Sequence, residues 1–185
     1  MSVEVSNVEP KEVWKNFVLL NEVPRPSKKE DRVIEFLISF AIKNNLMYKQ
    51  DEVGNLVIVK ESTPDMITRE TVVLQSHVDM VHEKNNDVEF DFLNSGIKMY
   101  VDGDWVKADG TTLGADNGLG VAAIMAILES NEISHPKIEA LFTIDEETGM
   151  TGALNLSDTI LTGKILLNLD TEEDLSLIHI SEPTR

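Results

Sequence analysis

The sequence predicts a layered α/β fold, because segments with helical periodicity alternate with short runs that are apolar at nearly every position. Such runs are typical of strands that are buried on both faces of a sheet. Four of them occur, at residues 55–60, 71–76, 137–144 and 164–169. Buried strands that alternate with helices indicate a central sheet with helices packed on it.

The N-terminal part carries two predicted helices, separated by the breaker PRPS. Residues 10–23 have apolar side chains at helical spacing. A longer helix is predicted to begin at Ser27, because Glu30 three residues later completes a capping-box pattern, and to end near residues 43–45. The apolar faces are formed by Val13, Phe17 and Leu20 in the first helix and by Val33, Phe36, Leu37, Phe40 and Ala41 in the second.

The remaining elements follow from turn signals and apolar runs. Residues 99–108 contain Asp-Gly between alternating flanks, which predicts a hairpin. The glycine-rich residues 110–120 lead into residues 121–130, which are apolar nearly all round and predict a buried helix. Residues 137–144 and 164–169 are predicted to be two further central strands.

Composition limits the classes of function. The chain has 185 residues, of which 42% are hydrophobic, and this is enough for one globular domain with its own core. Its net charge is −17, from 33 acidic and 16 basic residues, which argues against binding to nucleic acid or to an anionic membrane. The same charge is compatible with cationic ligands, including metal ions.

The chain contains no cysteine. Disulfides, a thiolate nucleophile and cysteine-based zinc sites are therefore excluded, and any metal would have to be bound by histidine and carboxylates. Residues 1–14 lack the basic start and apolar core of a signal peptide, and no apolar run reaches the length of a transmembrane helix. We expect a cytoplasmic protein.

Polar residues stand where several of the predicted strands and helices end or begin: His77, Asp79, Asp116, residues 145–147 and Asp170. Each of them, taken singly, is better explained as a turn residue, a helix cap or a solvated acidic group. Taken together, they place the residue types that bind zinc-like metals at four separate positions. Because functional groups gather at the carboxyl ends of strands in α/β sheets, we expect these residues to meet in one cleft.

Distinct roles can be assigned within such a cleft. His77 and Asp79 point to the same side of the chain, so His77 can bind a metal while Asp79 orients its imidazole. Asp116 has two oxygens and could bridge two ions, as in aminopeptidases. Glu146 and Glu147 have diverging side chains, so one can bind metal while the other acts as the general base for amide hydrolysis.

Four stretches in combination resemble the successive motifs of the di-zinc metallopeptidases of carboxypeptidase and aminoacylase type: LQSHVDMV, GTTLGADNGLGVA, TIDEETGMTGA and LLNLDTEE. The resemblance is strongest to the bacterial aminoacyl-histidine (Xaa-His, or β-Ala-His) dipeptidases, also called cytosol non-specific dipeptidases. The stretches HVDMVHEKNND and GDWVKADGTTLGADNG favour these enzymes over tripeptidases and deacetylases. The fold implied is a three-layer α/β/α zinc-peptidase catalytic domain with a mixed central sheet.

The resemblance implies a role for each site residue. Asp79 would orient a ligand, Glu146 would be the general base, and the peptide bond between Asp116 and Asn117 would be cis. Two Zn²⁺ ions would occupy the complete site, with Mn²⁺ or Co²⁺ as substitutes. The implied metal ligands are His77, Asp116 as the bridge, Glu147 and Asp170.

The resemblance covers residues 8–174 and implies that residues 1–174 are the N-terminal part of the catalytic domain. Family members are more than twice as long, with a final histidine ligand and a lid domain for dimerisation and substrate binding, none of which is found here. Residues 175–185 are expected to be an aberrant, non-native tail, and His179 within it matches no family position. His82 and His135 match no ligand position and are expected to be ordinary loop residues.

The implied function is hydrolysis of unblocked dipeptides, Xaa-His among them, by a homodimeric full-length enzyme; the 185-residue chain itself is expected to be inactive. Two alternatives stay open. One is a tripeptidase or an N-acyl amino acid deacylase on the same metal site, since substrate choice lies in the absent domain. The other is a non-catalytic metal-binding scaffold, against which the intact set of six site residues speaks.

Overall fold

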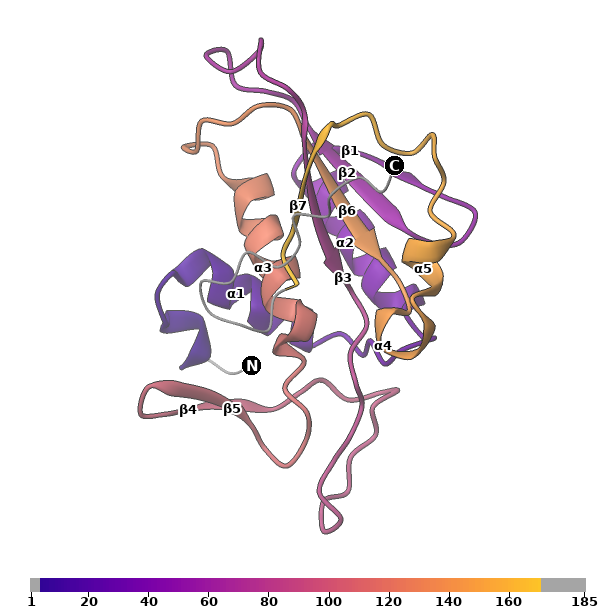
Figure 1. Ribbon diagram of the computed structural model, residues 1–185. Helices are drawn as coiled ribbons and strands as arrows, with labels where there is room; N and C mark the ends of the chain where they lie inside the picture. Colours follow the sequence, from indigo (N-terminus) through magenta and orange to yellow (C-terminus); the bar gives the residue numbers. More distant parts are fainter. Residues whose placement is uncertain (1–3, 171–185) are drawn as a thin grey trace, which may run out of the picture.

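The computed structural model describes residues 4–170, and its centre is a mixed five-stranded sheet in the order β1-β2-β6-β3-β7 (Figure 1). The mixed sheet confirms the α/β fold that the sequence predicts. The predicted tail at residues 175–185 lies outside the described residues. The strands are β1 (Met47–Gln50), β2 (Leu56–Lys60), β3 (Val72–His77), β6 (Ile138–Thr143) and β7 (Ile165–Asn168).

Strand β6 lies in the middle of the sheet, antiparallel to β2 and parallel to β3. All six of its residues are buried, including Glu139 and Thr143, the two polar residues in an otherwise apolar run. Strand β3 is paired on both sides, with β6 and with β7. Because these three strands are parallel, their carboxyl ends lie at the same edge of the sheet, where the chain leaves each strand with a polar residue.

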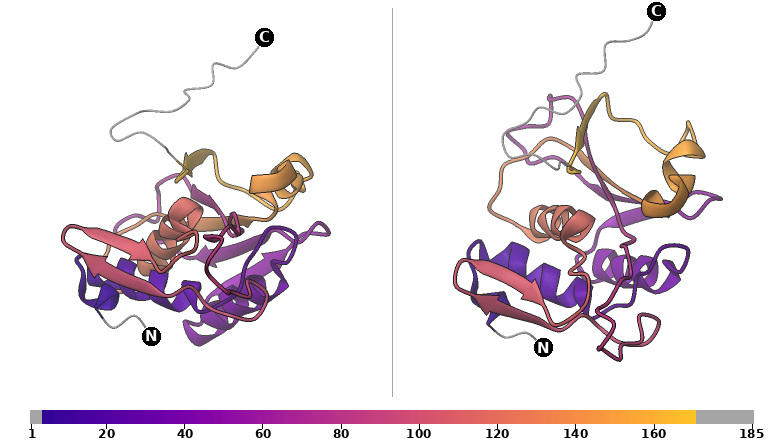
Figure 2. Two further views of the ribbon diagram at one scale, coloured as in Figure 1. Left: turned by 90° about the horizontal axis from the view of Figure 1, so that it is seen from below. Right: turned by 60° about the horizontal axis from the view of Figure 1, so that its bottom comes forward.

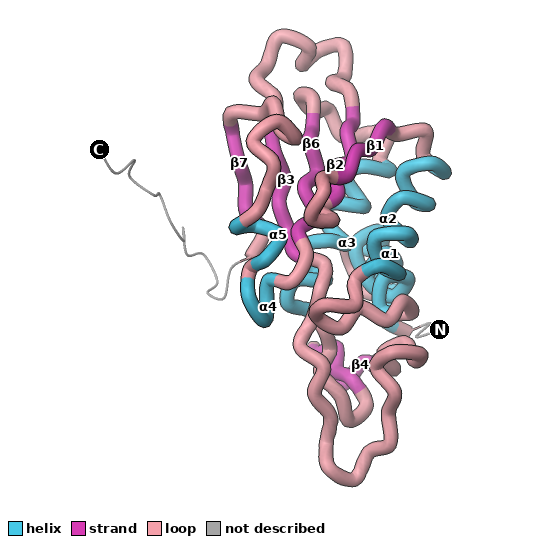
Figure 3. Tube along the Cα trace, turned by 90° about the vertical axis from the view of Figure 1, so that its right-hand side faces the viewer, coloured by secondary structure: helices cyan, strands magenta, loops and turns pink. Residues whose placement is uncertain are grey.

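Three helices cover one face of the sheet: α1 (Lys11–Asn21), α2 (Asp31–Lys43) and α3 (Ala115–Glu129) (Figure 3). The side chains between these helices and the sheet form the main core. Helix α3 is apolar nearly all round because it is enclosed by the sheet and α1. The core includes Leu20, Val33, Leu37, Leu56, Ile58, Leu74, Ile124, Ala140 and Phe142.

The opposite face of the sheet is covered by residues 155–164, next to the short helices α4 (Glu146–Gly149) and α5 (Thr151–Leu154). Here Val57, Val73 and Leu141 pack against Ile160. These strand residues alternate with the ones that face the long helices, as the two-residue period of a strand requires. The sheet is thus covered on both faces, which explains why its central strands are apolar at successive positions.

The predicted hairpin is present as β4 (Met99–Asp102) and β5 (Trp105–Ala108), and it lies beside α1, away from the sheet (Figure 2). A second cluster of buried side chains joins it to α1, α3 and the 3-10 helix η1 (Val5–Asn7). Within residues 4–170, no helix is long and apolar enough to cross a membrane. The buried members of the cluster are Val5, Phe17, Val18, Met99 and Ala122.

Three features differ from the sequence-based predictions. Strand β1 was not predicted, because its residues at the sheet edge are mostly exposed and carry no apolar pattern. Strand β7, predicted to be central, lies at the other edge of the described sheet, and its four residues are exposed. The capping box was wrong: α2 begins at Asp31, and Glu30, at its N-cap position, makes no side-chain cap bond.

Candidate metal centre

The site begins where β3 ends. His77, the last residue of β3, is only 1% exposed, and Asp79 is fully buried. Their side chains point to the same side of the chain, and His77 Nδ1 lies 3.2 Å from Asp79 Oδ1. The carboxylate can only accept a hydrogen bond, so Nδ1 carries the proton and donates it. His77 Nε2 is therefore the nitrogen that is free to bind a metal.

Asp79 is held by four hydrogen bonds. Its Oδ1 accepts from His77 Nδ1 and from the backbone N–H of Glu146 at 3.0 Å. Its Oδ2 accepts from Ser27 Oγ at 2.8 Å and from the backbone N–H of Glu147 at 3.2 Å. Burial alone would raise the pKa of Asp79, but these bonds and the charge of His77 lower it. Asp79 is therefore an ionised group that fixes the start of α4 relative to β3.

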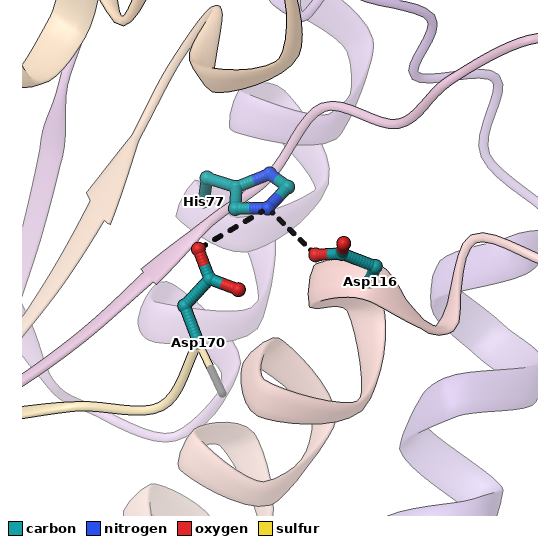
Figure 4. Close-up of side chains that lie close together, drawn as sticks. All are labelled: His77, Asp116 and Asp170. Atoms are coloured by element: carbon teal, nitrogen blue, oxygen red, sulfur yellow. Dashed lines mark hydrogen bonds and ion pairs between the residues drawn. The ribbon is translucent and has the colours of Figure 1, made fainter. Parts of the chain in front are cut away.

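Two further carboxylates converge on His77 Nε2 (Figure 4). Asp116 Oδ1 lies 3.0 Å from this nitrogen and Asp170 Oδ2 lies 3.8 Å from it. One ligand atom of each residue lies within 4.8 Å of the others. The three side chains come from the end of β3, the beginning of α3 and the residues after β7. An imidazole nitrogen with carboxylate oxygens is a donor set that suits zinc and related ions.

Asn117 connects the segments that carry this cluster. The peptide bond between Asp116 and Asn117 is cis, as the resemblance implies. The Asn117 carbonyl oxygen accepts a hydrogen bond from Ser76 Oγ at 3.1 Å, and its side-chain Nδ2 donates to Leu169 O at 3.0 Å. Ser76 precedes His77 and Leu169 precedes Asp170, so one side chain and its backbone tie together the three strand and helix ends.

The paired glutamates lie at the first turn of α4. Glu146 Oε2 is 3.9 Å from His77 Nε2, at the edge of the cluster. Glu147 does not belong to the closely spaced group of His77, Asp116 and Asp170 among the described residues. Burial, chiefly, raises the pKa of both glutamates, and neighbouring carboxylates add to this effect. The two glutamates thus stand beside a centre that is crowded with negative charge.

The charge around His77 favours a cation at the centre. Burial would lower the pKa of His77, but the hydrogen bond and charge of Asp79, with Asp116 and Asp170, raise the pKa to about 9. The imidazole therefore carries a second proton, on Nε2, at neutral pH when no ion is bound. A divalent ion would replace this proton, since a histidine ligand must be neutral. The residues present thus fit a metal ion in chemistry, spacing and charge.

Sequence reasoning missed several residues that support the site. Ser27 and Glu30 have the spacing of a capping box, but Ser27 donates to Asp79, and Glu30 Oε1 accepts from the backbone N–H groups of Lys28 and Asp145. Glu30, Asp79 and Asp145 form a second group of close carboxylates, all buried, which adjoins the first through the contact of Asp79 with His77. The available signal in the sequence was the polar pair Ser27 and Glu30 just before a predicted helix. Such a pair can cap the helix or can support a nearby site, and only the tertiary structure shows which of the two applies.

Glu30 provides a prediction on pH dependence. Burial, with a contribution from the charge of Asp79, raises the pKa of Glu30 above its ordinary value of 4.5. The folded state therefore binds a proton on the Glu30 carboxyl more tightly than the unfolded state does. The resulting stabilisation of the folded state is fully present below pH 4.5 and is lost as the pH rises through the folded pKa. Glu30→Gln keeps an acceptor oxygen without the charge. We expect it to raise the free energy of unfolding of the metal-free protein at pH 7 by about 0.5–2 kcal/mol.

Urea unfolding at several pH values between 4.5 and 7.5 measures this effect. The gain should shrink as the pH falls, because the wild-type Glu30 becomes neutral as well. Glu35→Gln, at an exposed position on α2, is the matched control and should change stability by less than about 0.5 kcal/mol. A stability gain that does not depend on pH would contradict the role given to the Glu30 charge.

Known proteins share this architecture. The peptidase family described as M20/M25/M40 matches residues 73–185. The cytosol non-specific dipeptidase of Escherichia coli K12 is 43% identical over 171 residues, which are 92% of this chain and 35% of that protein. The chain thus spans about a third of the length of this relative.

Two solved structures have a fold similar to that of this chain. The aminoacylhistidine dipeptidase of Vibrio alginolyticus is 46% identical and superposes with a TM-score of 0.90, covering 92% of this chain and 35% of that one. A tripeptidase of Staphylococcus aureus is 25% identical, with a TM-score of 0.75, and covers 90% of this chain and 45% of that one. Both structures share the fold described above, and the first shares far more of the sequence.

Proposed function

Since the chain belongs to peptidase family M20/M25/M40, we propose that its full-length enzyme, the product of the complete reading frame, is a metal-dependent dipeptidase. Its substrates would be unblocked dipeptides, including Xaa-His dipeptides of the β-Ala-His type. The observation that carries the hydrolytic function is the convergence of Asp116 and Asp170 on His77 Nε2, with Glu146 beside them. The choice of dipeptides is supported by the similarity to two dipeptidases.

The residues that would hold two Zn²⁺ ions are His77, Asp116 as the bridge, Glu147 and Asp170. Mn²⁺ or Co²⁺ could take the same positions, because the ligands are nitrogen and oxygen atoms. When bound, the ions would supply Lewis-acid polarisation of the scissile carbonyl and activation of the attacking water. A further ligand would come from the part of the relatives' length that this chain does not span.

The remaining site residues would move the proton and fix the geometry. Glu146 would accept a proton from the attacking water and pass it to the leaving amine. Its raised pKa suits both steps, because a carboxylate that binds the proton more firmly is a stronger base near neutral pH. Asp79 would hold Nδ1 of His77 protonated, so that Nε2 is the nitrogen that faces Asp116 and Asp170 and can bind the metal.

The proposal extends to the whole protein. We propose a cytoplasmic homodimer, with a lid and dimerisation domain and the rest of the catalytic domain outside residues 1–174. Residues 175–185 would be non-native. The 185-residue chain would bind metal weakly and would not turn over dipeptides, if a ligand and the substrate domain lie in the part of the relatives' length that it does not span. Hydrolysis of dipeptides at normal rates by the purified 185-residue chain would contradict this part of the proposal.

Substrate profiling of the full-length enzyme tests the proposed specificity. We expect β-Ala-His and other unblocked dipeptides to be cleaved with kcat/KM at least about tenfold above that for tripeptides and N-acetyl amino acids, which corresponds to about 1.4 kcal/mol in transition-state binding. Preference for tripeptides would instead favour the second candidate function, which the likeness to the Staphylococcus aureus tripeptidase supports. Preference for acetylated substrates would indicate a deacylase.

Removal of the metal tests the dependence on the ion. Dialysis against a chelator should abolish hydrolysis, and Zn²⁺, Mn²⁺ or Co²⁺ should restore it. Binding should also release a proton from His77, because its raised pKa of about 9 keeps the imidazole charged at neutral pH in the metal-free state. Calorimetric titration with the metal in two buffers of different ionisation enthalpy measures the number of protons released per ion bound. Full activity in a metal-free preparation would refute the proposed mechanism.

A further inference from the structure

Arg25 is the largest buried side chain that the proposed function leaves without a role. It lies in the loop between α1 and α2 and is 1% exposed. Its backbone is anchored next to the site, since the Arg25 carbonyl oxygen accepts a hydrogen bond from Met80 N at 3.2 Å. A buried guanidinium costs free energy unless its donors are satisfied. Among the described residues Nε has no hydrogen-bond partner, so the bonds of Nη1 and Nη2 show what the side chain stabilises.

The guanidinium bridges two segments of the site. Its Nη1 donates to the backbone carbonyl oxygens of Val78 at 3.1 Å and Asp79 at 3.2 Å. Its Nη2 donates to Gly114 O at 2.6 Å and to Asn21 Oδ1 at 2.9 Å. The first pair of acceptors follows β3, directly after His77. The acceptor at Gly114 precedes α3, two residues before Asp116.

The turn before α3 is shaped around this side chain. Gly114 has φ of +68°, and a Cβ on it would lie 2.5 Å from Arg25 Nη2. A Cβ on Gly118 would lie at the same distance from Nη2. Asn21, which accepts from the guanidinium, also donates to Leu113 O at 3.0 Å. The Asn21–Arg25 pair therefore holds both carbonyl groups of the dipeptide Leu113–Gly114.

The charge of Arg25 matters as well as its shape. Burial lowers the pKa of Arg25 to about 10, while the charges of Asp79, Asp116 and Glu147 act against this shift. The group is still a cation at neutral pH and stands behind the carboxylates. A cation there would repel a metal ion by simple electrostatics, so any gain in metal affinity from Arg25 must come from geometry.

We propose that Arg25 is a positioning residue for the metal centre: by holding the Val78–Asp79 carbonyls and the Gly114 carbonyl on one guanidinium, it sets the separation between His77 and Asp116. The planar fork of arginine can reach both segments at once, which the single ammonium of lysine cannot do. This inference rests on the proposed function insofar as His77 and Asp116 bind the metal, but it does not depend on the substrate.

Arg25→Lys in the full-length enzyme tests the proposal, because it keeps the charge and removes the bridge. We expect the dissociation constant for Zn²⁺, measured by competition with a chromophoric chelator, to rise about 10- to 100-fold. The absorption spectrum of bound Co²⁺ should change, since it reports ligand geometry. The turnover number should fall while KM changes less than about threefold. Arg25→Met, which also removes the charge, should weaken Zn²⁺ binding as well if geometry dominates.

Arg32→Lys is the matched control. Arg32 is an exposed arginine near the start of α2 that donates to the backbone carbonyl of Leu93, so it also bridges to a loop but touches none of the site residues. We expect wild-type metal affinity and an unchanged Co²⁺ spectrum. If Arg25→Lys does not fold, Asn21→Ala tests the proposal instead, because it removes one acceptor of the guanidinium and the bond to Leu113 O in the turn before α3. It should also weaken Zn²⁺ binding and change the Co²⁺ spectrum.

The proposal is overturned if folded Arg25→Lys binds Zn²⁺ within about twofold of the wild type with an unchanged Co²⁺ spectrum, even if its unfolding temperature falls. That result would mean that Arg25 only stabilises the fold. A wild-type enzyme that binds metal but cleaves no peptide would refute the proposed function alone, because the metal-binding comparison would still test Arg25.

Discussion

Glu146→Ala should lower kcat of the full-length enzyme by at least about 10²- to 10⁴-fold, the range that a general base contributes, and leave its metal content near that of the wild type. The reason is the place of Glu146 at the edge of the cluster, with Oε2 3.9 Å from His77 Nε2. From there its carboxylate can reach a water beside the cluster of His77, Asp116 and Asp170. Steady-state kinetics and metal analysis of the same preparation measure both quantities.

Glu147→Ala is the matched control, because it removes the same side chain from the adjacent position. We expect it to lower the metal content, as a lost ligand should, and its activity should recover in part at high Zn²⁺ concentration. The activity of Glu146→Ala should not recover. Substantial turnover by Glu146→Ala would refute the base assignment, and the opposite pattern in the two variants would exchange their roles.

Asp79→Ala should have the largest effect on stability. The substitution leaves the N–H groups of Glu146 and Glu147, the hydroxyl of Ser27 and the Nδ1–H of His77 without their acceptor. It also removes a buried negative charge beside Arg25. Removing one partner of a buried, paired charge costs about 3–5 kcal/mol. We expect a loss of this size in the free energy of unfolding, and a fall of about 10- to 100-fold in metal affinity.

Urea unfolding and metal competition measure the two effects of Asp79→Ala. Asp91→Ala is a suitable control, because Asp91 accepts hydrogen bonds from Leu93 N and Asn94 Nδ2 but is exposed. Its loss should cost less than about 1 kcal/mol and leave metal binding unchanged. Similar losses of stability in both variants would show that Asp79 is an ordinary turn residue.

The parts of this protein that the sequence predicts are those encoded locally. Strand β6 is recognisable because it forms a short run of mostly apolar residues, and His77 and Asp79 are recognisable because they are polar residues at the end of such a run. The convergence of Asp170 on His77 follows from the parallel pairing of β3 with β7, whereas Asp116 reaches His77 from the beginning of α3. The roles given to these residues stay predictions until the variants above are measured.

The parts that the sequence does not predict depend on contacts between distant segments. Ser27 and Glu30 have the spacing of a helix cap, and nothing local shows that Asp79 and Asp145 are their partners. Arg25 lies in a stretch that predicts only a helix break. Strand β1 has no apolar pattern, because it forms at the sheet edge by pairing with β2.

The strand order also constrains synthesis on the ribosome. Strands β2 and β3 are consecutive in the chain, yet β6 lies between them in the sheet, and Val72 pairs with Ile138. Both apolar strands must therefore wait for β6 to emerge before they can be buried. Such long-range parallel pairing is slow and leaves apolar segments open to aggregation. The nascent chain should therefore need protection by chaperones until residue 143 has left the exit tunnel.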